Sequence, residues 1–210
     1  MMRMDFDLYF ITDRGLSKKG VLEDVKSAIR GGVRIVQYRE KGSPTHEMVE
    51  EAREIRKLCK YNSVIFIVND RIDVALASEA DGIHIGPDDM DFQTARKILG
   101  ENKIIGVTVS SLEDAKKFEE LGADYLSLSP IFATSTKKDA GKPIGTEVLK
   151  KANGELRIPF MAIGGITQEN LAGVLKAGCG RVCMISAILT KDNVEEEVRK
   201  IRRIINDNTA

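Results

Sequence analysis

The stretch VIFIVNDRIDVALASEADGIHI, residues 64–85, contains the unit from which the fold of the chain can be predicted. It opens with the apolar run Val64–Val68 and closes with the short run Gly82–Ile85, which follows the element Ala80-Asp81-Gly82. Runs of Ile and Val without polar alternation are typical of parallel strands buried on both faces. A glycine just ahead of a strand suits the left-handed conformation in which helices end. We therefore expect a strand, a helix and a second strand here.

The same alternation extends in both directions along the chain. Amphipathic segments such as Glu47–Lys60, Leu112–Leu121 and Gln168–Ala177 separate short apolar runs, and glycine again precedes strands at Gly122-Ala123-Asp124. Eight units in one unbroken series predict an α/β fold, a single (β/α)₈ TIM barrel forming one catalytic domain over residues 1–210. An open doubly wound sheet is the alternative, since period alone does not establish closure. The predicted strands are Leu8–Thr12, Ile35–Tyr38, Val64–Val68, Gly82–Ile85, Ile104–Val107, Tyr125–Leu128, Phe160–Ile163 and Arg181–Met184.

Composition excludes several classes of partner. The 32 basic and 32 acidic residues cancel, so no overall field recruits nucleic acid or a membrane surface. No apolar run approaches the roughly 20 residues of a membrane span, and the first residues do not form a secretory signal. The odd set Cys59, Cys179 and Cys183 has no CxxC pair, which predicts buried thiols in a reducing cytoplasm. Small molecules are thus the expected partners, and homo-oligomerisation stays open.

Polar side chains follow the predicted strands at the ends where such barrels place their active sites. The sixth connection, residues 129–145, is also too long for a plain loop and is expected to be functional. In strand order, the groups are Gln37, Arg39 and Lys41; Asn69, Asp70 and Arg71; Asp88 and Asp89; Thr108; Thr134, Ser135, Thr136, Lys137 and Lys138; Gly164-Gly165; and Ile185-Ser186.

The types of residue at this rim indicate an anion site with a metal. Arg39 can grip two phosphate oxygens at once, while Lys41 and Lys137 supply point charges. Asp70 and Asp89 offer hard oxygen ligands to Mg²⁺, which takes one or two carboxylates together with substrate phosphates and water. The absence of a His or Cys partner argues against zinc.

A second anion is expected on the opposite side of the rim. Gly164-Gly165 precedes an amphipathic helix, and glycine lets backbone N–H groups approach a phosphate closely. This position, after strands seven and eight, is where the fold commonly binds phosphate. We therefore expect a metal-bound diphosphate on one side and a monophosphate on the other.

Each group taken alone has a simpler interpretation. Asp70 suits a helix N-cap or an exposed ion pair, and Asp89 suits the start of the next helix. His84 lies within a strand pattern and is expected to be a packed or hydrogen-bonded core residue, whereas His46 is expected on the surface. These interpretations do not explain why suitable polar residues follow six consecutive strands.

The motifs together resemble the thiamine-phosphate synthase family. The resemblance runs from Tyr9 to about Ile188, and the run Thr134-Ser-Thr-Lys-Lys-Asp139 is its most specific part. It implies a transferase that joins 4-amino-2-methyl-5-hydroxymethylpyrimidine diphosphate to a thiazole phosphate, releasing pyrophosphate. The other matching stretches are Val36–Lys41, Asn69–Asp73, Ala80–Gly86 with Asp89, Ile163–Ile166 and Met184–Ile188.

The resemblance also implies roles for individual residues. Lys137, Arg39 and Thr108 are expected to be catalytic, and Asp70 and Asp89 to hold Mg²⁺. Contacts with the pyrimidine diphosphate fall to Gln37, Tyr38, Arg39, Glu40, Lys41, Asn69, Thr108 and Lys137. Contacts with the thiazole phosphate fall to Thr134, Ser135, Thr136, Gly165, Ile185 and Ser186.

The mechanism implied is dissociative. Mg²⁺, Arg39, Lys41 and Lys137 neutralise the leaving pyrophosphate, the aminopyrimidine delocalises the cation that forms, and the thiazole nitrogen captures it. Such catalysis needs positioning and electrostatics, with no protein nucleophile. Two positions depart from the family pattern: Thr108 replaces a serine but keeps the hydroxyl, and Pro87 replaces a glutamine and removes a backbone N–H.

Three other functions have to be distinguished from this one. A related thiazole tautomerase shares several motifs, but its relatives carry a catalytic His where this chain has Ser110 and generally lack the carboxylate matched by Asp89. A non-catalytic thiamine-phosphate-binding module would need no Mg²⁺ ligands. Other phosphate-binding barrels, such as sugar-phosphate epimerases, fit the Asp70 and Asp89 pair poorly.

Overall fold

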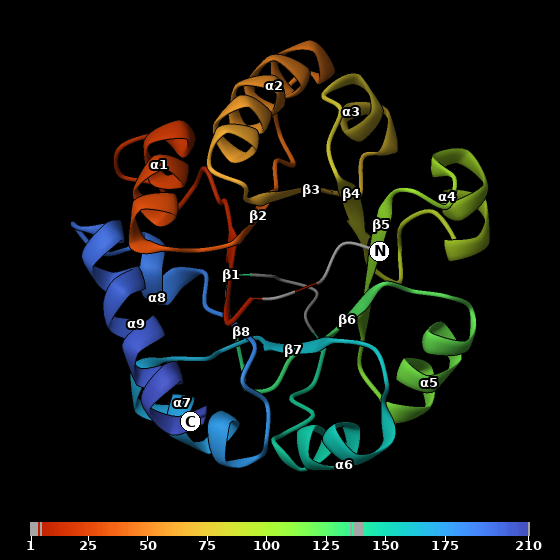
Figure 1. The fold of residues 1–210 in the computed structure, drawn as a ribbon, viewed down its shortest axis with the longest axis vertical. Helices are drawn as coiled ribbons and strands as arrows, with labels where there is room; N and C mark the ends of the chain where they lie inside the picture. The colour runs from red at the N-terminus through yellow and green to blue at the C-terminus, as the bar shows by residue number, and fades with distance from the viewer. Residues whose placement is uncertain (1–3, 5, 135, 137–140, 210) are drawn as a thin grey trace.

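The computed structural model describes residues 4, 6–134, 136 and 141–209, and it confirms the predicted barrel. Parallel strands pair in chain order, and β1 pairs with β8 to close the ring. Figure 1 shows this ring of strands enclosed by helices. The strands are β1 (Leu8–Ile11), β2 (Ile35–Tyr38), β3 (Ile65–Asn69), β4 (Gly82–Ile85), β5 (Ile104–Val109), β6 (Tyr125–Leu128), β7 (Phe160–Ile163) and β8 (Val182–Cys183).

Helices follow the strands and cover the outside of the ring. The last helix packs against both the first and the seventh, so it completes the outer layer between them (Figure 1). The helices are α1 (Val21–Gly31), α2 (Thr45–Tyr61), α3 (Ile72–Ala77), α4 (Phe92–Leu99), α5 (Leu112–Glu120), α6 (Glu147–Glu155), α7 (Gln168–Lys176), α8 (Ser186–Leu189) and α9 (Val194–Thr209).

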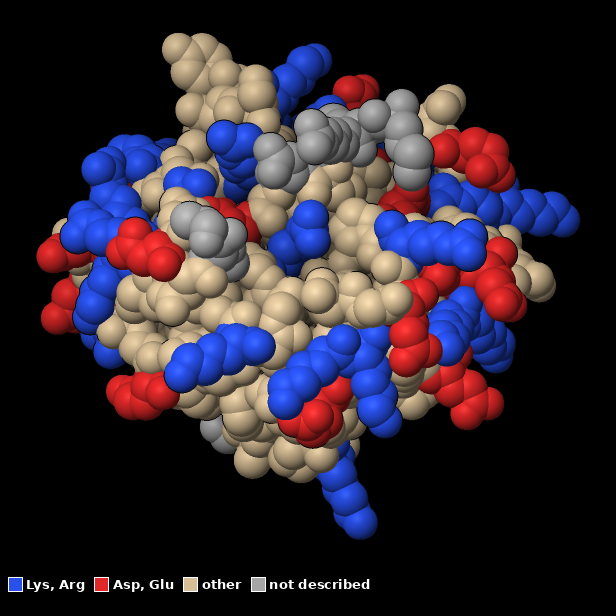
Figure 2. All heavy atoms as spheres, turned by 60° about the horizontal axis from the view of Figure 1, so that its bottom comes forward, with Lys and Arg blue, Asp and Glu red and all other residues tan. Residues whose placement is uncertain are grey.

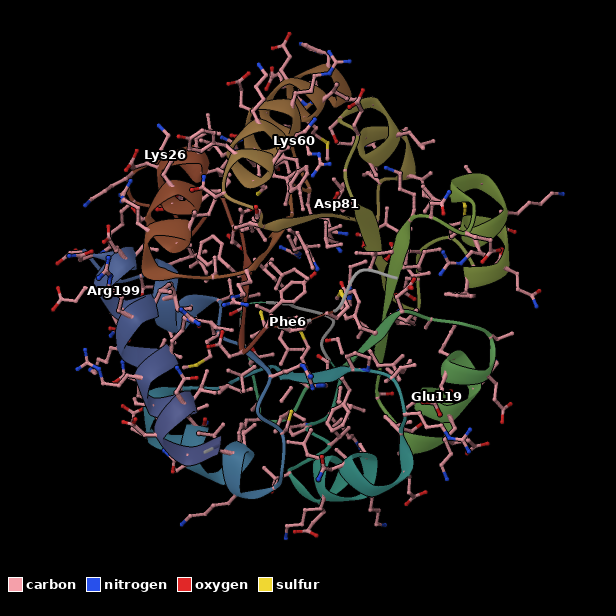
Figure 3. The ribbon with its side chains drawn as sticks, viewed as in Figure 1. Phe6, Lys26, Lys60, Asp81, Glu119 and Arg199 are labelled. Atoms are coloured by element: carbon pink, nitrogen blue, oxygen red, sulfur yellow. The ribbon has the colours of Figure 1, made fainter. Side chains whose placement is uncertain are left out.

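Two apolar clusters divide the core between the inside and the outside of the ring. Alternate strand residues point in opposite directions, so Ile35 joins the inner cluster while Val36 joins the cluster between strands and helices. Met4 and Phe6 extend the inner cluster ahead of β1, and Figure 3 shows Phe6 near the middle of the ring. The interior is therefore filled by side chains, as expected for this fold.

The strand boundaries differ from the predicted ones by one or two residues. β5 continues through Thr108 and Val109 because these β-branched residues keep pairing with β6, so Thr108 lies in the strand and not in the loop after it. Asn69 likewise ends β3. β8 is only Val182–Cys183, because the backbone turns at Ile185 into α8.

The repeated Ala-Asp element before strands has a structural role. Asp81 accepts a hydrogen bond from the backbone N–H of Phe66 at 2.8 Å and one from Arg56 at 2.8 Å. Asp124 accepts from the backbone N–H of Ile105 at 2.8 Å and from Arg96 at 2.7 Å. Each carboxylate thus joins a strand to the next one and to a helix of the preceding unit. Figure 3 shows Asp81 beside β3 and β4.

The fit of α9 against α1 depends on a glycine. A Cβ at Gly31 would lie 2.6 Å from Val198 Cγ1 and 3.1 Å from the backbone oxygen of Glu195. Since neither neighbour is the end of a long flexible side chain, only glycine allows the two helices to approach this closely. Arg202 of α9 also binds both carboxylate oxygens of Asp7, at 3.0 and 2.8 Å. The last helix is therefore fixed to the segment that begins β1.

The surface agrees with the balanced composition. Figure 2 shows basic and acidic side chains interspersed over the visible face, so the charge there is mixed. Within the described residues, no helix has the length and apolar character required to cross a membrane. Cys59, Cys179 and Cys183 are buried free thiols, as predicted.

Candidate active site

A cavity of about 1140 Å³ opens where the loops follow the strands. It collects side chains from β2, β3, β4 and β5 on one side and the segments after β6, β7 and β8 on the other. The structure therefore brings together residues that are distant in sequence. Predicted residues lining the cavity are Gln37, Arg39, Lys41, Asn69, Asp70, Asp89, Thr108, Thr134, Thr136, Gly165, Ile185 and Ser186.

Two predicted substrate contacts do not reach this cavity with their side chains. Tyr38 alternates with Gln37 along β2 and packs in the outer cluster, between strands and helices. The carboxylate of Glu40 binds Arg14 Nε at 2.6 Å and accepts from the backbone N–H of Gly42 at 2.7 Å. Tyr38 and Glu40 are therefore absent from the residues that line the cavity, because the side chains of their neighbours in the motif point the other way; their contact with the pyrimidine diphosphate stays a prediction.

The end of β1 supplies two residues that sequence reasoning missed. Thr12, which is almost fully buried, accepts the backbone N–H of Arg39 at 2.9 Å and donates to its carbonyl at 3.4 Å. Asp13 lies 3.5 Å from the guanidinium of the same arginine. These contacts fix the direction in which Arg39 enters the cavity. The only signal in the sequence was that Thr12 ends the predicted first strand and Asp13 directly follows it.

Asp70 and Asp89 approach each other across the ends of β3 and β4. Asp70 has a left-handed backbone, φ 59°, and its carboxylate accepts hydrogen bonds from Asn69 at 2.6 Å and from Lys41. Asp89 accepts the backbone N–H of Gly86 at 2.7 Å. The two carboxylates therefore share a small volume beside a cationic side chain.

Pro87 belongs to the turn that orients Asp89. The backbone N–H of Asp89 donates to the carbonyl of Gly86 at 3.3 Å, which closes a four-residue turn with proline in its second position. Proline favours that position because its ring fixes φ near the required value. The replacement of the family glutamine thus removes an amide but stabilises the turn that returns the Asp89 carboxylate toward Gly86.

The electrostatics of this pair favour a bound cation. Burial, with a contribution from the neighbouring Asp89, raises the pKa of Asp70 from its ordinary 3.8 to about 6, although Lys41 opposes the shift. Two carboxylates with oxygen donors alone fit Mg²⁺, which requires few protein ligands. Within the described residues there is no cluster of three or more His, Cys, Asp or Glu side chains.

The opposite wall of the cavity contains a glycine turn. Gly164 and Gly165 have φ values of 101° and 62°, and a Cβ on Gly165 would lie 2.3 Å from the carbonyl oxygen of Ala133. Asn170 of α7 donates to the carbonyl of Gly165 at 2.9 Å and accepts the backbone N–H of Thr167 at 2.8 Å. The glycine turn is therefore held open beside the start of α7. Such a turn leaves backbone donors accessible to an anion.

The loop after β6 is only partly described. Thr134 and Thr136 line the cavity, and the hydroxyl of Thr134 accepts the backbone N–H of Thr136 at 3.3 Å. Ser135 and Lys137, which were predicted to bind the substrates, lie outside the described residues, as does Lys138. Ser110, the position that bears a histidine in the tautomerases, also lines the cavity.

Buried polar side chains form the inner wall of the cavity. His84 contacts the hydroxyl of Thr108 at 2.8 Å through Nε2 and that of Tyr125 at 2.9 Å through Nδ1, which confirms it as a hydrogen-bonded core residue. Tyr125 contacts the hydroxyl of Tyr9 at 2.8 Å, and Gln37 donates to Tyr9 at 2.9 Å. Neither tyrosine was singled out from the sequence, because each occupies an ordinary buried strand position. His46, in contrast, is exposed as expected.

Comparisons with known proteins agree with this geometry. A family model described as thiamine monophosphate synthase matches residues 8–188. The chain is 52% identical to a thiamine-phosphate synthase from Methanosarcina barkeri over 93% of this chain and 88% of the relative. It is 45% identical to a thiamine-phosphate synthase from Chloroflexus aurantiacus over 96% of this chain and 94% of the relative.

A solved structure supports the same relationship. The thiamine phosphate pyrophosphorylase from Pyrococcus furiosus superposes with a TM-score of 0.90 and 40% sequence identity. The superposition covers 98% of each chain.

Proposed function

Because the chain belongs to the thiamine monophosphate synthase family, we propose that its cavity binds a pyrimidine diphosphate on one wall and a thiazole phosphate on the other. Family membership makes the chain an enzyme, a transferase that forms thiamine phosphate. The proposal concerns which residues hold each reactant. The observation that carries it is the meeting of Asp70 and Asp89 beside Lys41, in a cavity whose far side is the Gly164-Gly165 turn.

The pyrimidine diphosphate is assigned to the wall formed by β2, β3 and β5. Gln37 and Thr108 offer hydrogen-bonding groups deep in the cavity, where they suit the heterocycle. Arg39 and Lys41 lie nearer the rim and suit phosphate oxygens. Asn69 ends β3 beside them. Lys137 completes this group by resemblance to the family alone, since it lies outside the described residues.

Asp70 and Asp89 would hold Mg²⁺, which when bound neutralises the charge on the diphosphate. This assignment follows from the raised pKa of Asp70, because a divalent cation relieves the repulsion between the two carboxylates. The ammonium of Lys41 contacts Asp70, so it can pair with either the carboxylate or a phosphate oxygen.

The thiazole phosphate is assigned to the opposite wall. Gly165 presents an open backbone turn, and Ile185-Ser186 follows β8 next to it in the barrel. Thr134 and Thr136 add hydroxyl groups from the loop after β6. Ser135 belongs to this set by resemblance. The two walls would then bring the thiazole nitrogen opposite the pyrimidine methylene carbon.

The chemistry follows from this placement. The bond between the methylene carbon and the diphosphate oxygen breaks, and its electron pair leaves with the pyrophosphate. The thiazole nitrogen donates its lone pair to the same carbon and forms the new C–N bond. Arg39 and Lys41 stabilise the charge that develops on the leaving group, and the walls align the reactants. No side chain needs to become a covalent nucleophile, which suits the buried state of the three thiols.

The test uses the purified chain with both precursors and Mg²⁺, and follows thiamine phosphate and pyrophosphate. Asp89→Asn keeps the shape of the side chain but loses its charge, so we expect kcat to fall at least 100-fold through weaker metal binding. Excess Mg²⁺ should restore part of the rate. Magnesium dependence would also separate this function from a binding module.

Asp192→Asn is the matched control. Asp192 is 95% exposed, pairs with Lys18, and does not line the cavity, so the same chemical change should leave turnover as in the parent chain. Normal turnover by Asp89→Asn would remove the metal assignment. Absence of thiamine phosphate from the unmodified chain would remove the assignment of the cavity to these two reactants.

The remaining parts of the proposal concern the setting of the enzyme. Its partners are the two small molecules, and the mixed surface charge supports this over a polyanionic partner. We place the enzyme in the cytoplasm, where buried free thiols such as Cys59 remain reduced. One barrel, residues 1–210, carries the whole site in this proposal.

A further inference from the structure

A continuous chain of hydrogen bonds runs through the barrel interior between two residues of the cavity. It begins at Gln37 of β2, passes through Tyr9, Tyr125 and His84, and ends at Thr108 of β5. Its four contacts measure 2.9, 2.8, 2.9 and 2.8 Å in that order. The three middle residues are buried, and His84 lines the cavity together with the two ends, Gln37 and Thr108. The chain thus connects two groups that the proposed function assigns to one substrate.

A glycine makes room for the middle of this chain. In the strand register, Gly106 of β5 lies between His84 of β4 and Tyr125 of β6. A Cβ at Gly106 would lie 2.0 to 2.4 Å from atoms of the Tyr125 ring and hydroxyl. Since that position has no side chain, the ring of Tyr125 crosses it and reaches His84, with ring centroids 5.5 Å apart. The contact therefore depends on a residue that no sequence motif identified.

The number of available hydrogens determines which group donates and which accepts along this chain of hydrogen bonds. The amide of Gln37 donates to the Tyr9 hydroxyl, so the hydrogen of that hydroxyl must go to another acceptor. Within the described residues Tyr125 is its remaining partner, so Tyr9 donates to Tyr125. Tyr125 then donates to Nδ1 of His84, and Nε2 of His84 carries the proton donated to Thr108. Burial raises the pKa of both tyrosines, which keeps their hydroxyl groups protonated.

We propose that Tyr9, Tyr125 and His84 are positioning residues that determine, through this directed chain, which atoms Gln37 and Thr108 present to the pyrimidine. The inference rests on the proposed assignment of that substrate to this wall. Gln37 uses its amide nitrogen internally and presents its carbonyl oxygen as an acceptor. Thr108 accepts from His84, so its own hydrogen is available to the cavity as a donor.

This pattern selects for a heterocycle with a matching edge. An amino group opposite Gln37 donates to the carbonyl oxygen, whereas an oxo group there would meet another acceptor. A site with a fixed acceptor therefore discriminates against the oxo analogue, because two acceptors face each other without a hydrogen. Reversal of the chain would present the amide nitrogen of Gln37 and remove that discrimination. The interior chain is thus a determinant of specificity for an aminopyrimidine.

The first test observes the direction in the unmodified protein. Nitrogen-15 NMR of the imidazole rings distinguishes the two neutral tautomers and the protonated ring. We expect His84 to be the Nε2–H tautomer. The exposed His46, the only other histidine in the chain, is the internal reference. A Nδ1–H tautomer or a protonated ring at His84 would overturn the proposed direction. This result does not depend on enzyme activity.

The second test measures discrimination between the aminopyrimidine diphosphate and its 4-oxo analogue. Tyr9→Phe removes the partner of the Gln37 amide while keeping the ring, so we expect the ratio of the two kcat/KM values to fall about tenfold. KM for the thiazole phosphate should stay unchanged. In a Gln37→Ala background, Tyr9→Phe should have no further effect on the ratio, because the residue it positions is gone.

Ser78→Ala is the control for loss of a buried hydroxyl. Ser78 is buried in the protein away from the cavity and donates to the backbone of α3, so its removal should affect stability without changing the ratio. An unchanged ratio in folded Tyr9→Phe would overturn the positioning role. If Gln37→Ala itself binds and converts the pyrimidine normally, the fault lies in the proposed substrate assignment instead.

Discussion

At the residue scale, Asp70 combines an unusual backbone with an unusual charge environment. Its positive φ is tolerated by aspartate better than by most side chains, and it directs the carboxylate toward Lys41 and Asp89. Both features cost stability in the protein without metal. Strain and unrelieved charge of this kind commonly mark a site arranged for a ligand.

The pKa of Asp70 leads to a prediction for the magnesium-free protein. Because the folded-state pKa, about 6, lies above the ordinary 3.8, the folded chain holds this proton more tightly than the unfolded chain. Its contribution to stability is therefore full below the ordinary value and is lost as pH rises through about 6. Carboxyl carbon-13 NMR should show Asp70 titrating near pH 6, and Asp89→Asn should lower that midpoint. A midpoint at or below 4 in the unmodified protein would contradict this.

The residue scale also shows where sequence reasoning about the site succeeds and where it fails. Arg39, Lys41, Asn69 and the two aspartates were predictable, because their types suit phosphate or Mg²⁺ and they follow strands at one rim. The direction of the Tyr38 side chain did not follow from the motif, because strand residues alternate, and this side chain packs in the outer cluster. The inner tyrosines were not predictable, since their role depends on pairing across the barrel.

At the scale of helices and strands, the repeated Ala-Asp motif does more than mark the start of a strand. The carboxylates of Asp81 and Asp124 each satisfy a backbone N–H of the preceding strand and an arginine of the preceding unit. A half-buried carboxylate in this place joins strand to strand and strand to helix. The sequence indicated the repeat but not its partners, because Arg56 and Arg96 are distant in sequence from the aspartates they bind.

Loss of one such carboxylate should be costly. Asp124→Ala leaves the backbone N–H of Ile105 and the guanidinium of Arg96 without this acceptor, so we expect a loss of about 1–3 kcal/mol in the free energy of unfolding. Urea denaturation measures the change. Asp192→Ala, at an exposed position, should leave stability unchanged. An unchanged free energy of unfolding in Asp124→Ala would show that these contacts of the Asp124 carboxylate do not stabilise the fold.

Helix α7 offers an opposite prediction. Gly173 lies within the helix, and a Cβ there would meet nothing within 4 Å. Gly173→Ala should therefore raise the free energy of unfolding by about 0.5–1 kcal/mol, because alanine loses less conformational entropy in a helix. Urea or thermal unfolding measures the gain, with activity retained. Destabilisation would mean that the space outside α7 is needed for another contact.

At the scale of the whole molecule, the order of elements follows from local patterns, whereas closure was predicted only from the count of eight units and not from any visible pairing of the chain's first and last elements. Eight alternating units were visible in the sequence because both periodicities are local. Closure depends on the pairing of β1 with β8 and on the packing of α9 against α1, which join opposite ends of the chain. Gly31 permits the packing of α9 against α1, although the sequence alone indicates only that a helix ends there.

The short eighth strand has a consequence for how the ring opens. β8 contributes only Val182 and Cys183, so each of its two ladders is shorter than those between β4 and β5. Transient local opening should start where β8 pairs with β1 and β7, which we call the seam. Amide hydrogen–deuterium exchange should therefore be faster at β8 than at β4. Since Ile185-Ser186 lies just beyond the seam, a bound thiazole phosphate should slow exchange there first. The bound thiazole phosphate would then also hold the barrel closed at β8.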